Sequence, residues 1–173
     1  GLLVGSAVNK LSNIGAARDE LRALDPSVVK QRSIKSSIGC AGVGLHSGQK
    51  IRITLHPAPA NHGIVFRRVD HAKQPLTPAR YDHVIDTRLS TNVGDTDAGI
   101  KIGTIEHLMA ALAGHRIDNV LIDIDADEVP VMDGSSAPFT FLIDCAGIEE
   151  QNAPRMVVEV LKTVEVEHSG CTA

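Results

Sequence analysis

The chain has 173 residues, the length of one ordinary domain, and its 43% hydrophobic content is sufficient for a buried core. Its formal net charge is -4, and it contains one tyrosine, three phenylalanines and no tryptophan. Both features argue against a nucleic-acid partner, which requires a basic surface and aromatic side chains for stacking. No run of roughly 18 apolar residues indicates a membrane span.

Cysteine usage indicates the compartment. Cys40, Cys145 and Cys171 are far apart and form no CxxC pair, so the sequence predicts neither a disulfide framework nor a thiolate zinc site. The first ten residues lack a basic region and a cleavage pattern, so no signal peptide is expected. A reducing, cytoplasmic location is the expectation.

The N-terminal residues have a helical pattern. Apolar residues recur at steps of three and four from Val8 to Leu24, and Asp25 and Pro26 end the pattern. We therefore expect an N-terminal extension, residues 1–29, with an amphipathic helix and no chemistry of its own. The main domain is expected over residues 30–173.

Most of the main domain has strand character. Alternation of Ile51, Ile53 and Leu55 with polar residues is typical of a half-buried strand. Strands are expected within 32–40, 49–57, 62–70 and 118–126, in short extended segments of 74–104, and twice within 155–173. The first two flank a glycine-containing turn that fits no phosphate-binding loop pattern, so they predict a hairpin.

Two core helices interrupt these strands. The first lies within 103–114, with Thr104 as the expected N-cap and Gly114 near its end. The second follows Ser136, its expected N-cap, and stops at Gly147. Runs of strands with two helices predict the α+β class, a mixed sheet with helices packed on it.

The first of these helices has two unlike faces. One face is an apolar stripe of Ile105, Leu108, Met109 and Leu112, which predicts docking on the sheet. The other carries Glu106, His107, Ala110, Ala111 and Ala113. Small residues on that face predict that a second body packs against it. A carboxylate and an imidazole in such a desolvated contact are candidates for chemistry.

A complete zinc site does not follow from spacing alone. His115 lies eight residues after His107, about 12 Å along a helix, which is too far for both to bind one ion. The HExxH pattern is also absent. Taken alone, Glu106 and His107 also fit an ordinary helix start with an interface histidine.

Five motifs favour a catalytic role for Glu106 and His107 over an ordinary helix start. Residues 42–48, 55–68, 86–91, 104–119 and 128–139 read GVGLHSG, LHPAPANHGIVFRR, DTRLST, TIEHLMAALAGHRIDN and EVPVMDGSSAPF. In this order and spacing they resemble the UDP-3-O-acyl-N-acetylglucosamine deacetylases, zinc enzymes of lipid A synthesis in Gram-negative bacteria. The resemblance runs from about Lys30 to Gly170.

The resemblance implies a two-domain fold in which both domains contribute residues to the site. It implies two similar α+β domains of the ribosomal protein S5 domain 2-like type. Each is a mixed, about five-stranded sheet with helices on one face, and the two helix layers meet. This chain resembles the N-terminal domain. The C-terminal zinc-ligand domain, with an HKxxD-type motif, a catalytic histidine and an oxyanion-stabilising threonine, has no counterpart here.

The resemblance also implies site residues. Glu106 corresponds to the general base and His107 to one of three protein ligands of Zn²⁺. Leu89 and Ser90 match the segment beside the metal and the substrate, UDP-3-O-acyl-N-acetylglucosamine. Residues 133–135, Asp-Gly-Ser, are a family marker whose residue types suit a turn entering a helix.

Three hypotheses remain at this stage. The chain is the N-terminal half of the deacetylase, inactive alone, or it is a non-catalytic binding or assembly module derived from that domain. In the third, two copies form a homodimer through Ala110, Ala111 and Ala113 and mimic the two halves.

Overall fold

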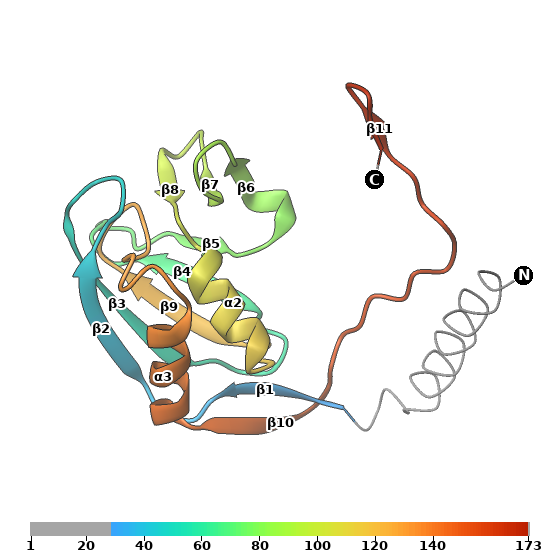
Figure 1. Cartoon of the computed structure of the whole chain (residues 1–173). Helices are drawn as coiled ribbons and strands as arrows, with labels where there is room; N and C mark the ends of the chain where they lie inside the picture. The colour runs from blue at the N-terminus through green and yellow to red at the C-terminus, as the bar shows by residue number, and fades with distance from the viewer. Residues whose placement is uncertain (1–28, 173) are drawn as a thin grey trace, which may run out of the picture.

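The structure, a computed structural model, describes residues 29–172 (Figure 1). The helix predicted between Val8 and Leu24 lies outside the described residues. No helix among residues 29–172 is long and apolar enough to cross a membrane.

The centre of the fold is a five-stranded mixed sheet, as predicted. Its strands are, in spatial order, β2 (Ile38–Val43), β3 (Lys50–Pro57), β9 (Val120–Ile124), β4 (Ile64–Arg68) and β5 (Leu76–Pro78). Only the β4–β9 pair is parallel. Helices α2 (Glu106–Gly114) and α3 (Ala137–Ala146) both cover one face of this sheet (Figure 1). The α+β prediction is confirmed.

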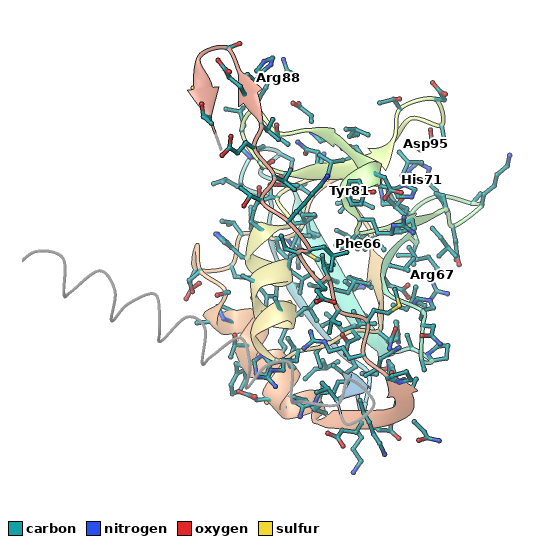
Figure 2. The ribbon with its side chains drawn as sticks, turned by 90° about the vertical axis from the view of Figure 1, so that its right-hand side faces the viewer. Phe66, Arg67, His71, Tyr81, Arg88 and Asp95 are labelled. Carbon is teal, nitrogen blue, oxygen red and sulfur yellow. The ribbon has the colours of Figure 1, made fainter. Side chains whose placement is uncertain are left out.

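The strand pattern explains the burial. Ile51, Ile53 and Leu55 of β3 are fully buried beneath the helices, while Arg52 between them is exposed. Phe66 of β4 is buried and lies nearer α2 than its neighbour Arg67, which pairs with Asp123 at 2.6 Å (Figure 2). The predicted β2–β3 hairpin is confirmed, and the core is mainly aliphatic.

Two smaller sheets lie at opposite ends of the main sheet. Strands β6 (Val84–Asp86), β7 (Asn92–Asp95) and β8 (Ile100–Ile102) form an antiparallel sheet at one end, after the short helix η1 (Tyr81–His83) (Figure 1). Strand β1 (Lys30–Ile34) pairs with β10 (Ile148–Pro154) at the other end. The single strand predicted over 32–40 is therefore wrong, because β1 leaves the main sheet to pair with β10.

The last residues depart from the main body (Figure 1). Strands β11 (Glu167–His168) and β12 (Cys171–Thr172) form a small hairpin, shorter than the two strands predicted. Residues 155–166 have no regular secondary structure. They expose Met156, Val157, Val158, Val160, Leu161, Val164 and Val166.

Three of the four predicted helix ends agree in position with the structure, at Gly114, Ser136 and Gly147, and the one at Thr104 does not. Thr104 is not the N-cap of α2, since Ile105 precedes the first helical residue and the Thr104 hydroxyl donates to Glu128 instead. Ser136 is at the predicted N-cap position of α3, but its side chain makes no cap bond. Gly147 ends α3 with φ 73°, as predicted for a glycine stop.

The apolar stripe of α2 is confirmed, but its other face is smaller than predicted. Leu108 and Leu112 are fully buried, and Ala110 and Ala113 are exposed. Ala111 is only 3% exposed and belongs to the core cluster. Its assignment to the outer face is wrong because α3 packs beside α2 and covers that side.

Candidate active site at the start of helix α2

The backbone before α2 is fixed from both sides. Gly103 donates its N–H to Asp127 O at 2.8 Å, and its carbonyl accepts the N–H of Val129 at 2.9 Å. Thr104 then takes the left-handed φ of 55°, which turns the chain into the helix. Glu106 and His107 are therefore presented by a rigid helix start.

The carboxylate of Glu106 is held by the loop that precedes β7. The backbone N–H of Thr91 donates to Glu106 Oε1. Burial raises the pKa of Glu106, but the hydrogen bonds from Thr91 and the nearby His107 lower it, and the net pKa is below its ordinary value. The side chain is thus an ionised carboxylate at neutral pH, able to accept a proton.

His107 stands beside this carboxylate and is half-buried. Within residues 29–172 its imidazole has no hydrogen-bond partner, so both ring nitrogens are available. Hydrogen bonds from Ser135 lower the pKa of Asp133, and the charge of His107 contributes to the same shift. The Asp-Gly-Ser turn therefore lies within electrostatic reach of His107.

The Asp-Gly-Ser turn itself has the structural role that its residue types predict. Asp133 Oδ1 accepts the N–H and the hydroxyl of Ser135, at 2.9 and 2.8 Å. The Ser135 hydroxyl oxygen accepts the N–H of Ala137, the first residue of α3, at 3.1 Å. These bonds form the entry to α3.

Leu89 and Ser90 lie in the same loop as Thr91. Leu89 is 86% exposed, and Ser90 is half-buried with its carbonyl accepting Asn92 Nδ2 at 2.9 Å. The Thr91 bond to Glu106 brings this loop to the start of α2. The four predicted site residues are therefore on two segments that contact each other, although sequence reasoning did not find Thr91.

His115 takes no part in this site. Its ring nitrogens contact Ala111 O at 2.9 Å and Asp144 Oδ1 at 3.0 Å, which ties the end of α2 to α3. Among residues 29–172 no group of three His, Cys, Asp or Glu side chains is placed to hold a metal ion. His107 can supply one ligand, and this part of the chain does not complete a metal site.

Glu128 is a buried carboxylate beside the segment that precedes α2. It is 5% exposed and accepts hydrogen bonds from Ser47 Oγ at 2.6 Å, Ser47 N at 2.8 Å and Thr104 Oγ1 at 3.3 Å. Burial raises the pKa of Glu128, but these bonds lower it below its ordinary value. Glu128 thus joins the β2–β3 turn to Thr104, in the segment that precedes α2.

Comparison with known families identifies the family of the chain. The family model described as UDP-3-O-acyl N-acetylglycosamine deacetylase matches residues 31–173. The chain belongs to this family. The matched region contains the whole candidate site, including Glu106, His107 and the loop that carries Thr91.

Individual relatives give the same result. A UDP-3-O-acyl-N-acetylglucosamine deacetylase of Acidithiobacillus ferrooxidans is 54% identical over 140 residues, which are 81% of this chain and 45% of the relative. Proteins of the same name from Legionella pneumophila and Stenotrophomonas maltophilia are 52% and 51% identical over 83% and 80% of this chain. The chain spans about half the length of the curated relatives it matches.

Proposed function

We propose that this chain supplies the base and one zinc ligand of a UDP-3-O-acyl-N-acetylglucosamine deacetylase, an amide hydrolase of lipid A synthesis. The observation that carries the proposal is the juxtaposition of Glu106, held by Thr91 N–H, with an imidazole that has both nitrogens available. Membership of the deacetylase family supports the reaction class.

Glu106 is the proposed general base. Its lowered pKa keeps it ionised, so it can take a proton from the water that attacks the acetamide carbonyl. The Thr91 amide bonds to Oε1, and Oε2 is the oxygen proposed to take that proton. Its position in the first turn of α2 also suits an anion, because the helix dipole is positive there.

His107 is the proposed zinc ligand. Neutral imidazole is a common ligand of Zn²⁺, and a bound zinc ion would supply Lewis acidity toward the water and the carbonyl. Residues 29–172 gather no group of three possible ligands, so the ligands besides His107 are proposed to come from outside them. Leu89 is proposed to contact substrate, because it is 86% exposed in the loop beside Glu106.

The three free cysteines suit the reducing cytoplasm in which this reaction is proposed to occur.

The competing function is a non-catalytic binding or assembly module. Retention of both Glu106 and His107 in a pre-formed arrangement favours catalysis, since a module of that kind has no use for an ionised carboxylate beside an available imidazole. Nothing in the described residues favours a two-copy site, in which each copy would bring one His107 and one Glu106.

A chimera tests the proposed function. Residues 31–155 of this chain would replace the matching segment of the Acidithiobacillus relative, and release of acetate from UDP-3-O-acyl-N-acetylglucosamine would be measured. We expect activity in the chimera and none in this chain alone, because one ligand and one base do not hold a catalytic zinc ion. A folded chimera without activity would support the non-catalytic module, and activity of the chain alone would contradict the need for further ligands.

A further inference from the structure

We propose that Asn92, locked in place by Gly103, is a positioning residue that holds the Thr91 amide on Glu106 Oε1. Asn92 bonds to Ser90 O and Asp86 O and not to Glu106, so it acts through the backbone of the loop beside it. The inference rests on the proposed function only in taking Glu106 as the base. Its geometric content is independent of any activity.

The first observation is how Asn92 closes the loop. Asn92 is the first residue of β7 and is 4% exposed. Its Nδ2 donates to Ser90 O at 2.9 Å and to Asp86 O at 3.3 Å. Both partners are carbonyl oxygens, so only the amide nitrogen fits there, and the orientation of the carboxamide is fixed.

These two bonds determine where Thr91 points. The loop leaves β6 at Asp86 and enters β7 at Asn92, and Thr91 lies between the two residues that share the hydrogen bond of the carboxamide. The β6–β7 register shifts between Val84 and Asp86, so a single backbone pair, Asp86 with Asn92, follows the irregularity and closes the loop. The carboxamide adds two bonds where the Asp86–Asn92 pair closes the loop, and directs the Thr91 N–H toward α2.

The second observation is the free oxygen of the same side chain. Asn92 Oδ1 is the one buried side-chain N or O atom among residues 29–172 that lacks a hydrogen-bond partner. It lies against Gly103, where an added Cβ would overlap it. An unpaired buried amide oxygen costs stability, which an apolar side chain would avoid. What the asparagine supplies is therefore the pair of Nδ2 bonds that closes the loop, and its oxygen adds no bond of its own.

Gly103 completes the connection to the base. Its N–H and carbonyl are both fixed, by Asp127 and Val129, so it cannot move away from the carboxamide. Three residues later the same segment presents Glu106. The carboxamide thus lies between the loop that donates the hydrogen bond and the segment that accepts it.

Amide hydrogen exchange by NMR tests this on the chain as it is. In Glu106→Ala the Thr91 amide has lost its acceptor. This variant therefore gives the reference exchange rate and chemical shift of a Thr91 amide without that hydrogen bond. We expect Asn92→Ala to raise the exchange rate of the Thr91 amide at least about tenfold toward that reference, since bonds to charged acceptors are among the stronger ones. The amide shift of Thr91 should move the same way.

Gly103→Ala is the second variant, and it leaves every hydrogen-bonding group in place. Its methyl group displaces Asn92 Oδ1, so the Thr91 amide should again exchange about tenfold faster. In the Asn92→Ala background the overlap is gone, and Gly103→Ala should then add less than about twofold. Such non-additivity marks contact between the two positions.

The matched control is Gln151→Ala, which removes two side-chain bonds near the opposite end of the fold, one to Ala58 O and one from Asn119 Nδ2, both at 2.7 Å. It should leave the Thr91 amide unchanged, whatever it costs in stability. If the amides of Val93 and Ile102 lose protection to the same extent as the Thr91 amide, the proposal is overturned. It is also overturned if the Thr91 amide loses no protection in either variant. If Asn92→Ala fails to fold, the Gly103→Ala result decides by the same criterion.

Discussion

At the residue scale, Glu128 supports the segment before α2 through its hydrogen bonds. It accepts bonds from the β2–β3 turn at Ser47 and from Thr104 before α2. We expect Glu128→Gln to lower the free energy of unfolding by about 1–3 kcal/mol, because the amide presents a donor to donors. Urea unfolding measures this. Glu150→Gln, an exposed carboxylate 3.5 Å from Arg32, is the control and should cost less than about 1 kcal/mol.

The pH dependence of this effect has a definite sign. The pKa of Glu128 in the fold is below its ordinary 4.5, so the unfolded chain takes up the proton first as the pH falls. The stability that ionised Glu128 contributes is therefore full above pH 4.5 and is lost as the pH falls through the lowered pKa. The difference between wild type and Glu128→Gln should shrink on acidification below pH 4.5. A difference that stays constant or grows would contradict the assignment.

Local sequence was sufficient for some site residues and not for others. The adjacency of Glu106 and His107 in the first turn of a helix follows from a local pattern, and the structure has it. The hydrogen bond from Thr91 joins residues 15 apart through a loop whose shape depends on packing, so no local pattern indicates it. Ala111 was misplaced because a helical periodicity does not say which neighbour covers which flank.

At the scale of the helix, two adjacent alanines of α2 give a matched pair. Ala110 is exposed, whereas Ala111 is 3% exposed in the core. We expect Ala110→Glu to change the free energy of unfolding by less than about 0.5 kcal/mol. Ala111→Glu should cost at least about 3 kcal/mol, because it places an unpaired charge in the core. Denaturant melts of the two variants decide, and equal costs would mean that α2 is rotated from its described position.

Elements were predictable where their patterns were strong. The alternation in β3 and β9 and the glycine end of α3 were all read correctly from sequence. Strand β10 was missed because its residues, IEEQNAP, are mostly polar and only its pairing with β1 makes it a strand. That pairing joins residues more than a hundred positions apart, which a local reading does not detect.

At the scale of the part of the molecule that the structure describes, residues 156–166 expose the largest group of big apolar side chains. Seven large apolar side chains between Met156 and Val166 are 60% to 96% exposed. Exposed apolar surface of this extent promotes association. A chain ending at Arg155 keeps the bonds of that residue to Asp118 and Val29, so it should stay folded and associate less. Light scattering against protein concentration measures the difference.

Light scattering also separates association through residues 156–166 from association through the outer face of α2. The strip formed by Ala110 and Ala113 remains a predicted dimer contact, now without Ala111. If the strip associates, Ala110→Glu in the shortened chain should lower its mass further. If the shortened chain is already monomeric, the dimer prediction is wrong. An association unaffected by either change would show that neither surface is responsible.

The central claim is that Glu106 is the base and His107 a zinc ligand, and one measurement separates these roles. In the chimera with the Acidithiobacillus relative, zinc content and deacetylase rate would be determined for Glu106→Gln and His107→Ala side by side. We predict that Glu106→Gln keeps zinc and loses about 10²-fold or more in rate, since the amide cannot accept a proton. His107→Ala should lose zinc and rate together. Equal zinc loss in the two variants, or an active Glu106→Gln enzyme, would contradict the account.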